Sequence, residues 1–546
     1  MGTSGVRLKT TTTRLRWSSA ACIAALFSAV VAAAPVEPVT PPAAALQTVD
    51  VWEFVVDGNT VLDDETIEAV LAPFMGPSRT ADDVDKARQA LEESYRDQGY
   101  KTVAVSIPRQ SATDGVVQFQ VQESRVGHLK VMGSRYHSID RILESAPALA
   151  EGKVPDFDEV QKDLVALNQQ ADRRVTPALK AGMRPGTVDV DLVVEDSLPL
   201  HGWVELNNRY SQDTSELRSL TSLSYDNLFQ RGHSFSLSFQ TAPQNPDDAK
   251  VMFGTYLARL GSSPWSMLLN TLKTDSAVST VGGINVLGSG SSVSLTGIRQ
   301  LEGPENFYPS LSVGVGYKDF DTTTLLGTAD FETPVKYFPL TLGYSLLYRG
   351  ERDLAQFDAA LTFASPQIGS DTETIQLNRF SARGQMFYLR ASVSDTHDFS
   401  NGAQAFARVS GQVTDQPLIS NEQISAGGMD TARGYLEAEA LGDYGLTGTL
   451  ELRSPPIGES LRIGGMVPLQ GFRFFVFADA AHLSLKGPLP DSSTPSSTDL
   501  LSVGAGLNLQ LFQYLNGVLD WARTIEDGPS TAGGADRVLF RVWTSF

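Results

Sequence analysis

The chain has 546 residues, more than one ordinary hydrophobic core supports, so we expect at least two structural units. Its formal net charge of -20 at pH 7 argues against a basic groove for nucleic acid, and we expect no nucleic-acid partner. Beyond the N-terminal apolar segment, no run of about eighteen apolar residues occurs, which argues against a transmembrane helix.

Residues 1–33 have the features of a secretory signal peptide. A basic start is followed by a small, apolar stretch over residues 20–34 that is too short to cross a bilayer. Cys22, the only cysteine, lies inside this segment, so the mature chain is expected to form no disulfide and no thiolate metal site. Prolines over residues 34–49 predict an extended lead-in. An exported chain without a transmembrane helix is either soluble or a membrane β-barrel.

Residues 50–123 have the pattern of a small α+β unit. Asp63 can cap the first predicted helix, and Thr80 with Asp83 opens the second at capping-box spacing. The last strand alternates apolar residues with Gln, which implies one buried face. The predicted order is a strand at 51–62, a helix that ends near Gly76, a helix from Thr80 to near Gly99, and strands at 101–108 and 115–123.

Residues 124–197 repeat the same order of strand, helix, helix, strand and strand. An internal repeat of about 75 residues is informative, because each copy is one supersecondary unit. The repeat alone leaves open a pair of ordinary α+β domains with no role in transport. The predicted elements are a strand at 126–134, helices at 138–149 and 156–170, and strands at 174–182 and 186–196.

Both units resemble POTRA domains, the periplasmic modules that precede barrels of the outer-membrane assembly and secretion superfamily. In the first unit, "YRDQGYKTVAVSIPRQ" followed by "GVVQFQVQES" is close to the family pattern, with Ser124 in place of the usual Gly. In the second, "LNQQADRRVTPALKAGMRPGTVDVDLVVED" resembles ShlB/FhaC/HecB-type transporters of two-partner secretion, although Ala171-Asp172 replaces a frequent Pro-Gly.

Over residues 198–546 the helical period gives way to segments of about ten alternating residues. Phe235, Leu237 and Phe239, for example, alternate with Ser and Gln. Alternation alone fits either a soluble sandwich or a membrane barrel. No helices are available to cover a large sheet, whereas closure into a barrel removes every sheet edge. We therefore predict an all-β transmembrane barrel of sixteen antiparallel strands, with roughly 22 residues per strand and connection.

Both ends of this region also resemble the family. Residues 204–248 are similar to the first two barrel strands of two-partner secretion transporters. The last strand, "RVLFRVWTSF", ends in Phe546 and resembles the signal by which outer-membrane barrels are recognised for insertion. The resemblance covers nearly the whole mature chain. It implies a place in the outer membrane, with outer-membrane lipids and the barrel assembly machinery as partners.

Catalytic and metal-binding patterns are missing from the sequence. It contains no H-E-x-x-H, no G-x-S-x-G and no phosphate-loop motif. The histidines follow no metal-ligand spacing, so we interpret each one as a surface or lumen residue. We expect no enzyme activity, no cofactor and no metal. The histidines are His128, His137, His201, His233, His397 and His482.

The tripeptide Arg433-Gly434-Tyr435 lies in a stretch rich in Gly and acid, residues 427–445, whose lack of periodicity predicts a loop. It resembles the Arg-Gly-Tyr core of the sixth extracellular loop of the superfamily, with Ala432 in place of the usual Val. Gly434 is expected to permit close approach or an unusual backbone angle, and Tyr435 to pack beside the arginine with its hydroxyl bonded. Taken alone, the tripeptide is weak, and Arg433 could be a solvated loop residue.

A second motif lies on a predicted strand some forty residues later. Phe477 and Asp479 fit the family pattern Phe-x-Asp-x-Gly, with Ala481 in place of the final Gly. The resemblance implies that the sixth loop folds into the lumen and that Arg433 pairs with Asp479. A guanidinium offers a planar fork to a carboxylate, and a charge in a partly desolvated lumen is costly unless it is paired.

The resemblance implies an outer-membrane transporter that moves a partner exoprotein from the periplasm to the cell surface. POTRA domains would recognise the unfolded client, the barrel would give the path, and the sixth loop would act as a plug or latch. The lead-in is too short for the plug helix that some transporters carry. A barrel or autotransporter assembly factor of the BamA or TamA type stays an alternative, although two POTRA units favour secretion. A passive porin is a more remote one.

Overall fold

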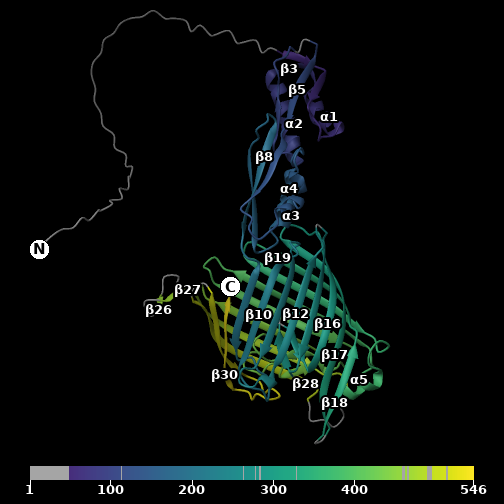
Figure 1. Ribbon diagram of the computed structural model, residues 1–546, viewed down its shortest axis with the longest axis vertical. Helices are drawn as coiled ribbons and strands as arrows, with labels where there is room; N and C mark the ends of the chain where they lie inside the picture. The colour runs from purple at the N-terminus through teal and green to yellow at the C-terminus, as the bar shows by residue number, and fades with distance from the viewer. Residues whose placement is uncertain are drawn as a thin grey trace, which may run out of the picture.

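The computed structural model describes residues 48–111, 114–261, 263–276, 278–281, 284–326, 329–457, 462–463, 467–488, 495–511 and 514–546. The predicted signal peptide with Cys22, and nearly all of the predicted lead-in, lie outside these residues. Two α/β units stand one above the other on one end of a closed barrel (Figure 1). We call the barrel end next to these units the near rim and the opposite end the far rim.

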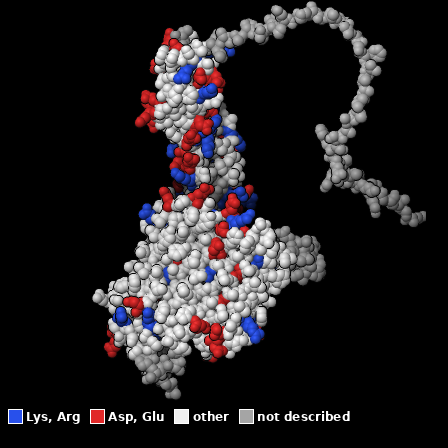
Figure 2. Space-filling model, turned by 180° about the vertical axis from the view of Figure 1, so that it is seen from behind, with Lys and Arg blue, Asp and Glu red and all other residues white. Residues whose placement is uncertain are grey.

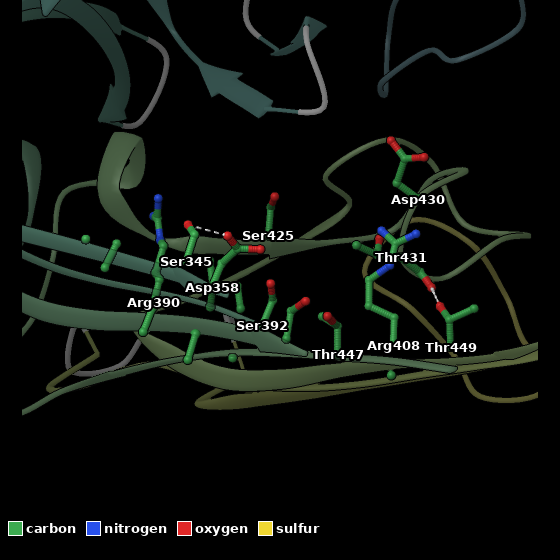
Figure 3. Close-up of a pocket in the computed structure, with 18 of the residues that line it drawn as sticks. Ser345, Asp358, Arg390, Ser392, Arg408, Ser425, Asp430, Thr431, Thr447 and Thr449 are labelled. Carbon is green, nitrogen blue, oxygen red and sulfur yellow. Dashed lines mark hydrogen bonds between the residues drawn. The ribbon is translucent and has the colours of Figure 1, made fainter. Parts of the chain in front are cut away.

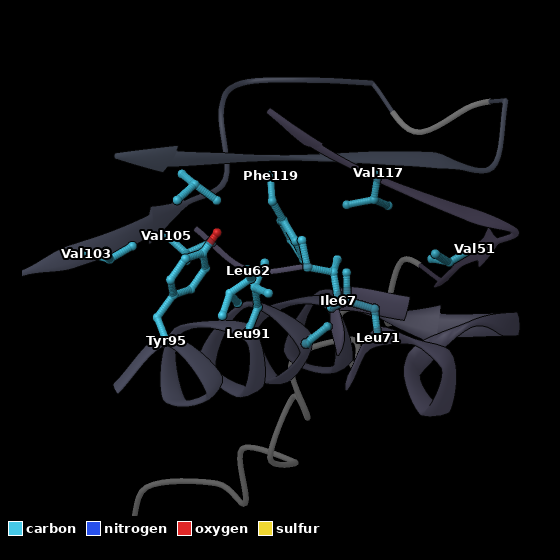
Figure 4. Packing of buried hydrophobic residues seen from close by; sticks show 12 residues of the cluster. Val51, Leu62, Ile67, Leu71, Leu91, Tyr95, Val103, Val105, Val117 and Phe119 are labelled. Carbon is cyan, nitrogen blue, oxygen red and sulfur yellow. The ribbon is translucent and has the colours of Figure 1, made fainter. Parts of the chain in front are cut away.

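The first unit packs two helices against a three-stranded sheet. Its elements are β2 (Glu53–Asp57), α1 (Asp64–Leu71), η1 (Ala72–Phe74), α2 (Ala81–Asp97), β4 (Val103–Ser106) and β5 (Val116–Glu123). In the sheet order β2-β5-β4, β2 is parallel and β4 antiparallel to β5. The predicted capping box is present, since Thr80 and Asp83 each bond the other's backbone N–H. Leu91 and Tyr95 of α2 face Phe119 of β5 in the core (Figure 4).

The beginning of this unit differs from the prediction. The predicted strand at 51–62 is instead two strands, β1 (Thr48–Val51) and β2, separated at the exposed Trp52. β1 pairs antiparallel with β3 (Gly76–Thr80), which was not predicted. The sequence G-P-S-R-T of β3 has no apolar alternation, because this strand contributes backbone hydrogen bonds and no core side chain.

The second unit has the same order of elements. They are β6 (Arg125–Met132), α3 (Ile139–Glu144), η2 (Pro147–Leu149), α4 (Phe157–Leu167), β7 (Arg173–Ala181) and β8 (Thr187–Asp196). The sheet order is β6-β8-β7, and Asp156 caps α4. The helix predicted over 138–149 was wrong in length: α3 ends at Glu144 and a 3-10 turn follows. Pro147 explains the break, because proline lacks the N–H that a continuing helix needs.

The rest of the chain forms the closed antiparallel barrel. Sixteen strands complete the wall within the described ranges, as predicted. β18 (Ala329–Tyr337) and β26 (Arg462–Ile463) also belong to this sheet; they pair with the ends of the long strands β17 and β27. The wall strands are β9 (Leu200–Asn207), β10 (Arg218–Leu228), β11 (His233–Thr241), β12 (Lys250–Arg259), β13 (Trp265–Thr274), β16 (Ser289–Gln300), β17 (Phe307–Leu326), β19 (Leu340–Arg349), β20 (Asp353–Ala364), β21 (Met386–Asp398), β22 (Gln404–Thr414), β25 (Tyr444–Arg453), β27 (Val467–Ser484), β28 (Ser497–Leu511), β29 (Leu515–Thr524) and β30 (Asp536–Ser545).

Short elements also lie in the loops at the far rim. Residues 242–249 contain η3 (Pro246–Asp248), and the next loop holds the hairpin of β14 (Val278–Val281) and β15 (Ile284–Leu287). The loop after β20 contains α5 (Thr372–Asn378). None of the helices in the described part of the chain is long and apolar enough to cross a bilayer.

The outer face of the barrel is apolar. Phe235, Leu237 and Phe239 of β11, whose alternation fits either a soluble core or a lipid-facing wall, each expose over 40% of their surface. In Figure 2 the acidic and basic side chains gather over the two α/β units, while most of the barrel wall carries none. An apolar outer face between charged ends is the surface that a lipid bilayer requires.

The first and last barrel strands close the wall, and the second unit sits directly on it. β9 pairs with β30, and Gly202 exchanges backbone hydrogen bonds with the C-terminal Phe546. At the near rim, the side chain of Gln230 in the β10–β11 turn accepts from the amide of Ser138 (2.9 Å) and donates to the carbonyl of Tyr136 (3.1 Å). These bonds join the second unit to the near rim.

Candidate functional site

The sixth loop at the far rim, residues 415–443, folds into the barrel; we call it loop 6. It connects β22 to β25 and contains η4 (Ser420–Glu422) and a short hairpin of β23 (Ile424–Ala426) and β24 (Ala440–Gly442). Its tip is buried, with Arg433 only 6% exposed and Tyr435 fully enclosed. A connecting segment with a buried arginine at its tip needs partners on the barrel wall.

Arg433 is held by Asp479 of β27 through three hydrogen bonds. Its Nε and Nη2 donate to the two carboxylate oxygens at 2.8 and 2.9 Å, and its backbone N–H donates to one of them at 3.1 Å. Asp479 is 1% exposed. The structure thus brings together the two charged residues that the sequence singled out, in the bidentate geometry that favours arginine over lysine.

A second carboxylate and an aromatic ring complete the surroundings of the guanidinium. Glu451 of β25 accepts from Nη1 of Arg433 at 3.1 Å and from Nε of Arg453 at 2.6 Å. The ring of Phe477 lies 3.4 Å from the guanidinium carbon of Arg433. Strand register explains this grouping, because Glu451 pairs with Phe477 and their side chains face the same side of the sheet.

A glycine on the next strand makes room for Phe477. A Cβ at Gly504 of β28, which pairs with Phe477, would meet the Phe477 ring at 2.3 Å. The Phe-x-Asp motif therefore places the ring and the carboxylate on the inner face, two residues apart, where both reach the arginine.

Gly434 and Tyr435 fix the tip of loop 6 against β28 and β29. Gly434 has φ +99°, which side chains rarely adopt, and a Cβ there would lie 3.0 Å from Thr524. The Tyr435 hydroxyl donates toward the carbonyls of Glu526 (2.7 Å) and Leu501 (3.0 Å). The Tyr435 hydroxyl is thus hydrogen-bonded. The aromatic ring that stacks on the Arg433 guanidinium is that of Phe477, not of Tyr435.

Sequence reasoning missed the contacts that hold the flanks of this tip. Arg209, in the loop after β9, pairs with Glu437 (3.1 Å) and Asp430 (2.6 Å) of loop 6. The carboxylate of Glu439 accepts from Ser530 and Thr531 in the loop after β29. Acidic residues are frequent in this chain, so no spacing distinguished these from solvated ones.

The end of loop 6 next to β25 is held by a further residue, Asp443. This residue is fully buried, and its carboxylate accepts from Arg379 (2.8 Å), the amide of Lys486 (2.6 Å) and the amide of Leu418 (2.8 Å). Arg379 and Lys486 belong to the loops after β20 and β27, and Leu418 belongs to loop 6 itself. Glu422, also in loop 6, is bonded to Lys318 of β17, Tyr337 of β18 and Tyr388 of β21.

Beside loop 6 the lumen contains a cavity of about 520 Å³ (Figure 3). Its walls come from the inner faces of β19 to β25 and from loop 6 itself. Most lining side chains are small or carry a hydroxyl, and charged groups of both signs are mixed with them. Such a wall offers hydrogen-bonding groups to water and to a polar chain. The labelled residues include Ser345, Asp358, Arg390, Ser392, Arg408, Ser425, Thr447 and Thr449.

The model of one protein family, haemolysin secretion/activation protein ShlB/FhaC/HecB, matches residues 186–509, more than half of the chain. The chain belongs to the ShlB/FhaC/HecB family. The model of the ShlB-type POTRA domain matches residues 49–124, which cover the first unit. These matches confirm the resemblance on which the sequence prediction rested.

This ShlB/FhaC/HecB protein is similar to known transporters over most of its length. It is 21% identical to the outer membrane transporter CdiB of Dickeya dadantii over 396 residues, 71% of this chain and 69% of that one. The solved structure of CdiB from Escherichia coli matches with a TM-score of 0.66 and 19% identity, over 93% of each chain. BamA from Haemophilus ducreyi without POTRA domains 1–3 matches at 0.53 and 14% identity, over 92% of this chain and all of BamA's.

Membership of the ShlB/FhaC/HecB family establishes the role and orientation. The protein is an outer-membrane transporter of two-partner secretion, with its POTRA region in the periplasm and a secreted exoprotein as partner. The near rim therefore faces the periplasm, and loop 6 begins and ends on the extracellular side.

One group in this ShlB/FhaC/HecB chain could hold a metal ion, judged over the described residues. It consists of Asp172, His201 and Asp226 at the periplasmic rim. No spacing in the sequence points to this group, because Asp172 lies in a turn of the second unit and His201 and Asp226 lie on two different barrel strands.

Proposed function

We propose that the two periplasmic units capture an unfolded segment of the exoprotein, and that the lumen passes it outward once the tip of loop 6 leaves its seat on the wall. The bidentate contact of Arg433 with Asp479 carries this proposal. It joins the tip of a long loop to the wall of the path itself. Loop 6 is then the latch of the closed state.

Edge strands of the periplasmic units support the capture step. The sheet orders β2-β5-β4 and β6-β8-β7 leave β4 and β7 with one unpaired side in the described part of the chain. An extended client segment can add to such an edge through main-chain hydrogen bonds, which depend little on its sequence. Capture by β-strand addition suits a client that is still unfolded.

The lumen next to loop 6 supports the conduction step. Its cavity is lined with hydroxyl groups and mixed charges, so a polar backbone can pass without meeting an adhesive apolar patch. Outward motion would come from folding of the client at the cell surface, since the periplasm holds no ATP. The protein provides recognition and a path, and we propose no catalytic step and no nucleic-acid partner.

Two further partners belong to this proposal. The apolar outer face of the barrel would contact outer-membrane lipids. The last strand, β30, ending at Phe546, would be recognised by the barrel assembly machinery when the protein itself is inserted.

A deletion strain tests the proposed function. Without the protein, an exoprotein encoded by the neighbouring gene should accumulate or be degraded in the periplasm, and plasmid-borne wild type should restore its secretion. The amounts of other outer-membrane barrels should not change, which separates secretion from barrel assembly. Normal secretion of that exoprotein in the deletion strain would contradict the proposal.

A further inference from the structure

Three side chains from two structural units meet where the second unit touches the barrel. Asp172 lies between α4 and β7 of the second unit, His201 lies on β9, and Asp226 lies near the end of β10. One nitrogen or oxygen atom from each lies within 4.8 Å of the other two. The group therefore spans the joint between the periplasmic units and the barrel.

Backbone geometry explains why these side chains converge. His201 pairs with Ser224 across β9 and β10, and Asp226 is two residues further on, so its side chain emerges on the same face as His201. Asp172 is held from the other side, because its carbonyl accepts from the amide of Ser197 at 2.9 Å, just before β9. Each ligand atom thus starts from a fixed strand or a bonded turn.

The distances between the atoms are short enough for one ion to contact all three, and Nε2 of His201 is also hydrogen-bonded to the Asp172 carboxylate. Nε2 of His201 lies 2.9 Å from the carboxylate of Asp172 and 3.8 Å from that of Asp226. The Asp172 side chain is 5% exposed, whereas His201 and Asp226 are 40% and 37% exposed. One imidazole therefore faces two carboxylates, one of them buried, and a buried charge is costly unless it is paired or coordinates a metal.

An open space adjoins the group. A cavity of about 340 Å³ at the periplasmic rim is lined by His201, Ser222 and Ser224 together with the C-terminal Phe546. Of the three side chains, His201 is the one that lines this cavity, which leaves room for water molecules on its side of the group. The arrangement has three convergent ligands and one open side, which is the coordination of an accessible metal site.

We propose that Asp172, His201 and Asp226 bind a divalent transition-metal ion, with Zn²⁺ as the best fit. Two carboxylate oxygens and one imidazole nitrogen form a donor set that suits Zn²⁺, and water from the cavity completes a tetrahedron. The ion replaces the proton on Nε2 and neutralises both carboxylates. This site is independent of the proposed role of loop 6.

The bound ion cross-links the second unit to the barrel, an effect that we call the staple. Without it, the joint relies on polar contacts such as that of Gln230 with Ser138. Metal bonds from Asp172 on one side and from His201 and Asp226 on the other fix the angle of the periplasmic units over the mouth of the lumen. Metal binding therefore narrows the range of orientations of these units.

Zinc titration of the full-length protein in detergent tests the site. Wild type should bind one Zn²⁺, and His201→Gln and Asp226→Asn should each weaken its binding at least tenfold. His233→Gln is the matched control, because His233 lies at the same rim but is bonded to Tyr256 and the Arg259 carbonyl. Thermal unfolding in EDTA, unchanged among the four proteins, excludes misfolding as the cause. Equal Zn²⁺ affinity in wild type and His201→Gln would overturn the proposal.

Spin labels test the staple. The described residues contain no cysteine, so labels at Met183→Cys, on the second unit, and at Ser400→Cys, in a turn of the near rim, are unambiguous. Zn²⁺ should narrow the distance distribution in wild type and leave it unchanged in Asp226→Asn. Tight Zn²⁺ binding without narrowing in wild type would overturn the staple.

Discussion

Arg433 is buried at the end of a long loop, and the surrounding wall supplies two carboxylates for it. Replacing it by Ala leaves Asp479, which is 1% exposed, without its cation, and breaking such a buried pair costs about 3–5 kcal/mol. Arg433→Ala and Asp479→Asn should each lower the free energy of unfolding by this order. The free energy of unfolding of Arg433→Lys should lie between those of these variants and wild type, because lysine keeps the charge but cannot donate two parallel hydrogen bonds to the carboxylate.

Heat-modifiable mobility on gels and thermal unfolding in detergent measure this loss, and the secretion of the exoprotein should fall with it. The double variant Arg433→Ala/Asp479→Asn should cost much less than the sum of the single variants, since the residues are in contact. Additive losses would show that the pair is not coupled.

Removing the charge of Asp520 on β29 should have the opposite effect on stability. It is 2% exposed, and its Oδ1 has no hydrogen-bond partner within the described ranges. Its side chain faces inward, since it pairs with Gly506, whose added Cβ would lie 2.3 Å from Oδ1. Asp520→Asn removes the charge of a buried carboxylate whose Oδ1 accepts no hydrogen bond from the described residues, so it should stabilise the barrel by on the order of 1 kcal/mol. A destabilised Asp520→Asn protein would mean that this carboxylate has a partner.

At the scale of single elements, the stability of the second unit depends on Asp196 at the end of β8. Its carboxylate accepts from the amides of Arg135 (3.0 Å), Tyr136 (2.8 Å) and His137 (3.2 Å). Burial alone would raise the pKa of Asp196, but these hydrogen bonds and the His137 side chain outweigh it, so the pKa lies below its usual value. The ionised form is therefore favoured in the folded state.

A lowered folded pKa fixes the direction of the pH dependence. The contribution of Asp196 to stability is fully present above the unfolded value of about 4 and is lost as the pH falls through the folded pKa. Hydrogen exchange of the amides at 135–137, corrected for intrinsic rates, should show protection that fades below about pH 4. Asp196→Asn should lack this dependence, and an identical pH profile in both proteins would contradict the assignment.

Local sequence patterns predicted most elements. They failed where an element forms only through its contact with another part of the chain. The capping box at Thr80 and the alternation in β11 lie within one segment and were predicted correctly. β3 was missed because it forms a strand through its pairing with β1, a tertiary contact that leaves no periodicity. For the site, motifs located Arg433 and Asp479, whereas Arg209 and Asp443 act through partners far away in the chain.

At the scale of the whole molecule, loop 6 ties the far rim to the lumen. Its end next to β25 is bonded through Asp443 to the loops after β20 and β27, and its tip is bonded to β27 through Arg433. In the proposed mechanism, release of the tip is the step that opens the path. Transport then requires the tip to move away from the wall.

A reversible tether of this tip is the most direct test. A Cβ at Gly434 would lie 3.5 Å from the Cβ of Ala522 on β29, within the range that a disulfide spans. In the Gly434→Cys/Ala522→Cys protein, the oxidised form should stop secretion of the exoprotein, and a reductant should restore it to the level of Gly434→Cys alone. Equal secretion by the oxidised and reduced forms, with the cross-link verified on gels, would contradict the latch.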